Sequence, residues 1–189
     1  WMHTGFLNVN GEKMSKSLGN FITIRDLLKN YSGETFRLFV LATHYRSPID
    51  FSEVSLHQAE KNLENIRKFI ANLDEKINPG LTGNLEYLIS LDDSELREEL
   101  LKFDYDNIDS TLKEHIDMFF NSMDDDFSTP KAIAAIFSFI KAFKDVDLDV
   151  KDLLAIKHWF ADISQILGID FLKYDNSSSS SGNDVELLN

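Results

Sequence analysis

One uninterrupted apolar seam constrains the fold of this chain more than any other feature. Its members alternate spacings of three and four residues, which places them on one face of a single helix; they are Leu56, Ala59, Leu63, Ile66, Ile70, Leu73 and Ile77. Such a helix is about 35 Å long at a rise of about 1.5 Å per residue. Ser52 can cap it, and Asn78-Pro79-Gly80 ends it. We expect the seam to pack within the chain, with an intermolecular coiled coil as the alternative.

Local signals define two shorter helices ahead of the long one. Thr23 is followed three residues later by an aspartate, close to a capping box, and this predicts a helix over 24–30. Ser32 can cap the next helix, whose apolar residues cover most of its circumference, so we expect that helix to be buried nearly all round. The stretch before them, "GFLNVNGEKM", predicts an extended segment with a turn at Asn10-Gly11.

The second half of the chain predicts a helical bundle. An amphipathic helix is indicated over 112–123. Thr129 at a cap position, with Pro130 directly after it, marks the start of another helix. Asp149 can cap a last helix, and Gly168 fits its C-terminal end.

These elements predict a mainly α fold in which a small mixed head is joined by the long helix to a helical bundle. The expected parts are 1–50, the head; 51–80, the long helix; 81–170, the bundle; and 171–189, a flexible serine-rich linker. The helical pattern over 81–109 is weaker than elsewhere. The chain opens on a tryptophan ahead of its first methionine, and we expect it to be a piece of a longer protein.

Charge is distributed unevenly along the chain. Residues 1–60 hold six basic and six acidic side chains, whereas 61–189 hold the remaining 13 basic and 26 acidic side chains and therefore the whole net charge of −13. An acidic body of this kind cannot bind a phosphate backbone over a wide face. Any polyanion is expected to meet the neutral head instead.

Composition excludes several kinds of site. The chain has no cysteine, which rules out a disulfide framework and cysteine-ligated metal within it. Its five histidines are scattered without metal-ligand spacing, so we expect no metal site in this segment. No apolar run approaches the roughly 20 residues that a membrane span needs, and we expect a cytoplasmic protein without a membrane partner.

The decapeptide "GEKMSKSLGN", residues 11–20 and here called the lysine loop, places Lys13 and Lys16 between two glycines. Two ammonium groups this close repel each other, so their placement suits a polyanion that neutralises them. Phosphoryl and nucleotidyl transfers develop negative charge that positioned lysines stabilise. Ser15 and Ser17 add hydroxyl donors, and the glycines allow the loop to close and reopen. The alternative is a solvated surface turn.

The segment "KMSKS" resembles the signature of class I aminoacyl-tRNA synthetases. The flanking segments restrict this resemblance to one family within the class. "WMHTGFLNVNGEKMSKSLGNFITIRDLL" and "ETFRLFVLATHYRSPIDFSEVSLHQAEKNLENI" are similar to the cysteinyl-tRNA synthetase family, in the region that follows its metal site. "MDDDFSTPKAIAAIF" resembles the start of the helical tRNA-binding domain of that family, the DALR-type domain. The resemblance covers roughly residues 1–77 and 115–168.

The resemblance implies both fold and activity. The head would be the end of a class I catalytic domain carrying the KMSKS loop, and the bundle an antiparallel DALR-type domain. Members of the family use ATP with Mg²⁺ to convert cysteine to cysteinyl-adenylate and pass the cysteinyl group to tRNA(Cys). The HIGH-type motif, the zinc ligands and the anticodon module of the family lie outside this segment. Zn²⁺ is therefore expected only in the full-length enzyme, and the segment alone is expected to be inactive.

The resemblance also assigns roles to individual residues. Lys16 would bind the ATP phosphates and stabilise the transition state, and Lys13 would assist. Ser15 and Ser17 would shape the loop around ATP. His3, in the strand that leads to the loop, would lie beside the adenosine, with a purely structural role as its alternative.

Arg46 could contact the acceptor stem of tRNA through its phosphates. A charge at a helix terminus or a structural salt bridge is the alternative for this residue. For the whole protein two other functions stay open: a cysteine ligase that acylates a small amine, and a noncatalytic helical module that binds tRNA or protein. We expect a monomer.

Overall fold

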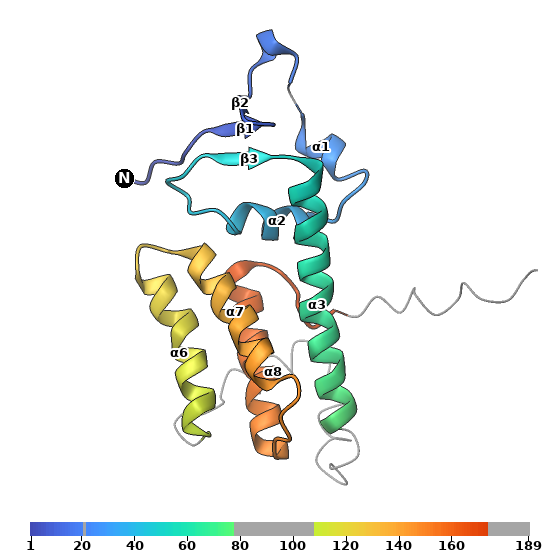
Figure 1. The fold of residues 1–189 in the computed structure, drawn as a ribbon, viewed down its shortest axis with the longest axis vertical. Helices are drawn as coiled ribbons and strands as arrows, with labels where there is room; N and C mark the ends of the chain where they lie inside the picture. Colours follow the sequence, from blue (N-terminus) through green and yellow to red (C-terminus); the bar gives the residue numbers. More distant parts are fainter. Residues whose placement is uncertain (21, 78–107, 174–189) are drawn as a thin grey trace, which may run out of the picture.

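The computed structural model describes residues 1–20, 22–77 and 108–173, and it consists of a small α/β head above a helical bundle (Figure 1). One long helix, α3, runs from the head down the side of the bundle and belongs to both. Most of the weaker helical pattern expected over 81–109, and most of the predicted linker, lie outside the described residues.

A three-stranded sheet forms the head, in the order β2-β1-β3. Strand β1 (Leu7–Val9) pairs antiparallel with β2 (Glu12–Lys13), and the turn between them holds Asn10 at φ 52° and Gly11 at φ 81°. Two successive residues with positive φ are typical of the tight turns that match strand twist, which explains why Asn-Gly stands here. On its other edge β1 pairs in parallel with β3 (Ile49–Phe51).

Three short helical elements follow the hairpin: the 3-10 helix η1 (Lys16–Leu18), α1 (Ile24–Leu27) and α2 (Gly33–Leu41). The two predicted caps are present, because Thr23 accepts a hydrogen bond from the Asp26 amide and Ser32 accepts one from the Thr35 amide. The prediction that the second helix is buried nearly all round is wrong. In α2 only Thr35, Leu38 and Phe39 are buried, since the helix lies between sheet and bundle and leaves its outer face open.

Helix α3 (Glu53–Ile77) confirms the apolar seam. Every predicted seam residue is buried, and Ser52 caps the helix by accepting a hydrogen bond from the Ser55 amide at 3.2 Å. The seam serves two cores. Its first members, Leu56 and Ala59, pack with head residues such as Phe51, whereas the positions from Leu63 onward pack in the bundle.

Helices α6 (Ser110–Asp124), α7 (Thr129–Phe143) and α8 (Val150–Leu167) complete the bundle. Asp149 caps α8, and Gly168 ends it at φ 64°, both as predicted. Helix α7 begins one residue earlier than predicted, since Ser128 rather than Thr129 occupies the cap position and makes no side-chain capping bond. Burial of apolar side chains from all four long helices supplies most of the driving force for this fold.

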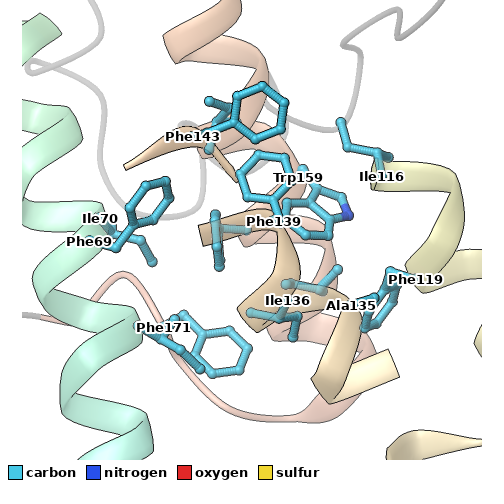
Figure 2. Close-up of a cluster of buried hydrophobic side chains, with 14 of the residues drawn as sticks. Phe69, Ile70, Ile116, Phe119, Ala135, Ile136, Phe139, Phe143, Trp159 and Phe171 are labelled. Atoms are coloured by element: carbon cyan, nitrogen blue, oxygen red, sulfur yellow. The ribbon is translucent and has the colours of Figure 1, made fainter. Parts of the chain in front are cut away.

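The centre of the bundle is aromatic (Figure 2). The Trp159 and Phe139 rings lie 4.5 Å apart between centroids, and both side chains are fully buried. Phe69 of α3 and Phe171, which follows α8, close the cluster from two further directions. Trp159 is thus a core residue.

In the described part of the chain, polar contacts join head and bundle at two places. At the inner joint, Arg67 of α3 binds Glu34 of α2 and the carbonyl of Asp170. At the outer joint, Tyr45 and Arg46 bind the carboxylate of Asp126, in the turn between α6 and α7. The position of the head, and of anything it carries, is therefore fixed relative to the bundle at two separate points.

Candidate functional site

The lysine loop leaves the sheet through a hairpin that is anchored on β3. The Gly11 amide donates to Asp50 Oδ1 at 2.8 Å, and the Asn10 amide donates to the Phe51 carbonyl at 3.1 Å. On the return strand the Met14 amide donates to the Leu7 carbonyl at 3.0 Å. The base of the loop is consequently part of the sheet, while the rest extends from its edge (Figure 1).

Hydrogen bonds within the loop hold its two ends together. The Asn20 side chain accepts from the Ser15 amide at 2.9 Å and donates to the Lys13 carbonyl at 3.3 Å. Ser15 Oγ lies 3.2 Å from Ser17 Oγ and accepts from the Leu18 amide at 3.3 Å. The four predicted residues Lys13, Ser15, Lys16 and Ser17 thus lie on one short, closed segment of backbone.

Lys13 is exposed, and its ammonium lies 4.2 Å from the centroid of the Phe6 ring. An aromatic face attracts a cation weakly at an exposed site. Among the described residues no carboxylate is paired with Lys13, so a phosphate can replace the ring without breaking an ion pair. Lys16 begins η1, three residues further along the loop.

A cavity of about 220 Å³ lies beneath the loop, between the sheet and helices α1 and α2. Its lining is largely apolar and includes Phe6, Met14, Ile22, Leu27 and Phe36. An apolar cavity cannot solvate a phosphate. Met14, the half-buried methionine of KMSKS, lines this cavity and packs against the core of the head.

The two remaining predicted site residues lie away from the loop. His3 is exposed in the segment ahead of β1, and the contacts of the described residues do not join it to the loop. Arg46 donates from Nε to the Tyr45 hydroxyl at 2.8 Å and from Nη2 to Asp126 Oδ1 at 3.0 Å. The Tyr45 hydrogen bond, and then the Asp126 charge, raise the pKa of Arg46. With 65% of its side chain exposed, this arginine still presents donors to solvent.

Two residues that hold the loop were missed by sequence reasoning. Asn20 ends the decapeptide itself, so its place beside the signature was the available signal. Asp50 gave no signal, because strand β3 was not predicted and its hydrogen bond spans 39 residues.

Neither a metal site nor a membrane span is found in the described ranges. Within residues 1–20, 22–77 and 108–173 no three His, Asp or Glu side chains are grouped to hold a metal ion. The helices in these same ranges lack the combination of length and apolarity that crossing a membrane requires.

Comparison with known proteins assigns both halves of the structure. Residues 1–61 match the family described as the tRNA synthetases class I (C) catalytic domain, and residues 118–172 match the DALR domain. The head with its KMSKS loop and the bundle behind it therefore define a segment of a class I aminoacyl-tRNA synthetase.

Individual relatives show which family of class I synthetases the chain resembles. The chain is 39% identical over its whole length to a cysteine–tRNA ligase of Thermococcus gammatolerans. It is 42% identical over 75% of its length to a cysteine–tRNA ligase of Geobacter metallireducens, and 43% identical over 77% to one of Geotalea daltonii. The chain belongs to the cysteinyl-tRNA synthetase family. It spans 37%, 26% and 28% of the length of these three relatives, respectively.

Proposed function

We propose that the whole protein to which this chain belongs activates cysteine with ATP and transfers the cysteinyl group to tRNA(Cys). One observation carries the proposal: an intact KMSKS segment, closed on itself and anchored to the sheet, in a chain similar throughout to cysteine–tRNA ligases. The two lysines supply positive charge where pyrophosphate leaves, and stabilisation of developing charge is a large term in such reactions.

Each loop residue has a separate task in this proposal. Lys16 binds the ATP phosphates and stabilises the charge that develops as the α-phosphorus is attacked by the cysteine carboxylate. Lys13 assists by leaving the Phe6 ring for the phosphates. Ser15 and Ser17 shape the turn and offer hydroxyl donors to the phosphates, and His3 lies near the adenosine.

Mg²⁺ would accompany ATP and neutralise part of its charge. Zn²⁺, which the family uses to select cysteine, finds no suitable donors in the described part of this chain, which has no cysteine anywhere. We therefore propose that the zinc ligands lie outside this segment. Because the HIGH-type motif of the family, which works on the same ATP, also lies outside this segment, we propose that the segment alone does not form the adenylate.

The bundle and Arg46 would meet tRNA. Arg46 keeps free donors beside its bonds to Tyr45 and Asp126, and it lies where the head meets the bundle. Because residues 61–189 carry the whole negative charge of the chain, most of the electrostatic attraction for tRNA would come from other parts of the protein. We further propose a monomeric, cytoplasmic enzyme.

The match of residues 118–172 to a DALR domain supports the tRNA enzyme over a cysteine ligase for small amines. A small acceptor needs no helical domain behind the loop. The unbroken KMSKS segment likewise argues against a noncatalytic module.

The test is cysteine-dependent ATP–pyrophosphate exchange by the folded, zinc-loaded full-length protein. Serine and methionine serve as control substrates. Lys16→Ala is expected to lower exchange by about 10³-fold, whereas Lys29→Ala, a lysine of the same head that pairs with Asp26, is expected to leave it unchanged. Absence of exchange with any amino acid would overturn the proposal. Full activity of Lys16→Ala would overturn the role of Lys16.

A further inference from the structure

Asn20, the last residue of the lysine loop, forms hydrogen bonds through its side-chain amide to two backbone groups earlier in the loop. Its oxygen accepts from the Ser15 amide at 2.9 Å, and its nitrogen donates to the Lys13 carbonyl at 3.3 Å. Gly19, at φ 68°, turns the chain so that the asparagine faces back toward these groups. Both bonds go to backbone, so they fix the path of the loop independently of where the lysine side chains point.

These two bonds differ in kind from the anchor at the base of the loop. The Asp50 carboxylate ties the hairpin turn to β3, and thus the loop to the sheet. Asn20 ties the far end of the loop to Ser15 and to Lys13, the last residue of β2. Because Lys13 and Met14 are themselves bonded into the sheet, the Asn20 amide holds the segment from Ser15 onward in register with the sheet-bound start of the loop.

We infer that Asn20 is a positioning residue that holds the backbone of Lys16 in a fixed relation to that of Lys13. This inference rests on the function proposed above. When ATP binds, this fixed relation lets both ammonium groups reach the phosphates at the same time. Without Asn20 each lysine must be ordered separately during the reaction, and small misplacements of catalytic groups cost large factors in rate.

The chemistry of asparagine suits this task. The Ser15 amide needs an acceptor and the Lys13 carbonyl needs a donor, and a carboxamide offers both on one planar group. Aspartate keeps the acceptor but lacks the donor, and it would place a negative charge near the phosphates. Alanine offers neither group.

Asn20→Ala and Asn20→Asp test the inference in the full-length protein, with Asn30→Ala as a matched control. Asn30 is an exposed asparagine of the same head, just beyond α1. We expect both Asn20 variants to lower kcat for cysteine-dependent exchange by about tenfold to a hundredfold, with KM for ATP within about threefold of the wild type. Transfer from preformed cysteinyl-adenylate to tRNA(Cys) should be unchanged, because pyrophosphate has already left.

The readouts separate positioning from damage to the fold. Equal losses in exchange and transfer, or a melting temperature below that of Asn30→Ala, would overturn the inference in favour of a structural role. Wild-type exchange in Asn20→Ala would overturn it as well, and wild-type exchange in Asn20→Asp would overturn the need for both bonds. If the wild-type protein itself shows no exchange, the proposed function falls and the inference falls with it.

Discussion

Arg67 on α3 donates to Glu34 on α2, with 2.6 Å between Nη2 and Oε2. The same nitrogen donates to the Asp170 carbonyl at 2.8 Å, and the other oxygen of Glu34 accepts from the Asp170 amide at 2.8 Å. Only 16% of the Arg67 side chain and 25% of the Glu34 side chain are exposed. Head, long helix and the segment after α8 therefore meet at one largely shielded ion pair.

Removal of Glu34 should destabilise the chain measurably. Glu34→Ala leaves a largely buried guanidinium without its carboxylate and the Asp170 amide without its acceptor, so we expect the free energy of unfolding to fall by about 2–3 kcal/mol. Glu64→Ala, which breaks an exposed pair with Lys68 on the same α3, should have no measurable effect. Urea unfolding of the wild type and the two variants measures these differences. Equal losses of unfolding free energy in both variants would contradict a stabilising role for the Arg67–Glu34 pair.

The packing of the aromatic core predicts that two phenylalanines contribute very differently to the free energy of unfolding. Phe139 is fully buried and packs against Trp159, so Phe139→Ala should lower the free energy of unfolding by about 3–5 kcal/mol through lost burial and a residual cavity. Phe127 is 57% exposed, and Phe127→Ala should change stability by about 0.5 kcal/mol or less. Denaturant unfolding followed by Trp159 fluorescence checks both. Similar losses would mean that Phe139 does not occupy the core.

Asp125 predicts a loss of stability in acid. Its Oδ2 lies 2.7 Å from Lys131 Nζ, and this hydrogen bond, with the lysine charge and a smaller contribution from His44, lowers the pKa of Asp125 below its ordinary value of 3.8. A carboxyl whose pKa is lower in the folded than in the unfolded state stabilises the fold above its unfolded pKa. That contribution is lost as the pH falls below 3.8 and through the folded pKa.

Asp125→Asn removes this titration. We expect the variant to be less stable than the wild type at pH 7 and the difference to disappear as the pH falls below 3.8. Because the pair is exposed, 1 M salt should also reduce the difference at pH 7. Urea unfolding at several pH values gives the comparison. A difference that persists at low pH would show that the asparagine acts by another route.

Sequence signals predicted the helices well because those signals are local. The seam of α3, the caps at Thr23, Ser32 and Asp149 and the stop at Gly168 each depend on residues within one or two turns. Strand β3 could not be predicted in this way. It is three residues long, and it exists because β1, some 40 residues earlier, pairs with it in parallel.

The residues of the candidate site likewise differ in whether local sequence predicts them. The lysines and serines of the loop follow from the motif, whereas their supports do not. Asp50 reaches Gly11 across 39 residues, and Arg46 reaches Asp126 across 80. Such contacts depend on how the elements pack, so no local pattern announces them. The role of Arg46 toward tRNA stays a prediction beside its contact with Asp126.

Gly5 and Gly11 are expected to resist substitution for different reasons. A Cβ at Gly5 would lie far inside van der Waals contact with the Ser47 carbonyl, and the Gly5 amide donates to the Tyr45 carbonyl at 2.8 Å. Because the atoms that a Cβ would meet belong to the backbone, Gly5→Ala must push the residues ahead of β1 away from the segment that carries Arg46. We expect a loss of about 2–3 kcal/mol in the free energy of unfolding, as for overpacked sites. At Gly11 a Cβ meets no atom within 4 Å among the described residues, and only the positive φ of 81° is unfavourable. Gly11→Ala should therefore cost about 1 kcal/mol. Urea unfolding ranks the two variants, and a larger loss for Gly11→Ala would mean that the segment around Ser47 can move away from Gly5 at little cost.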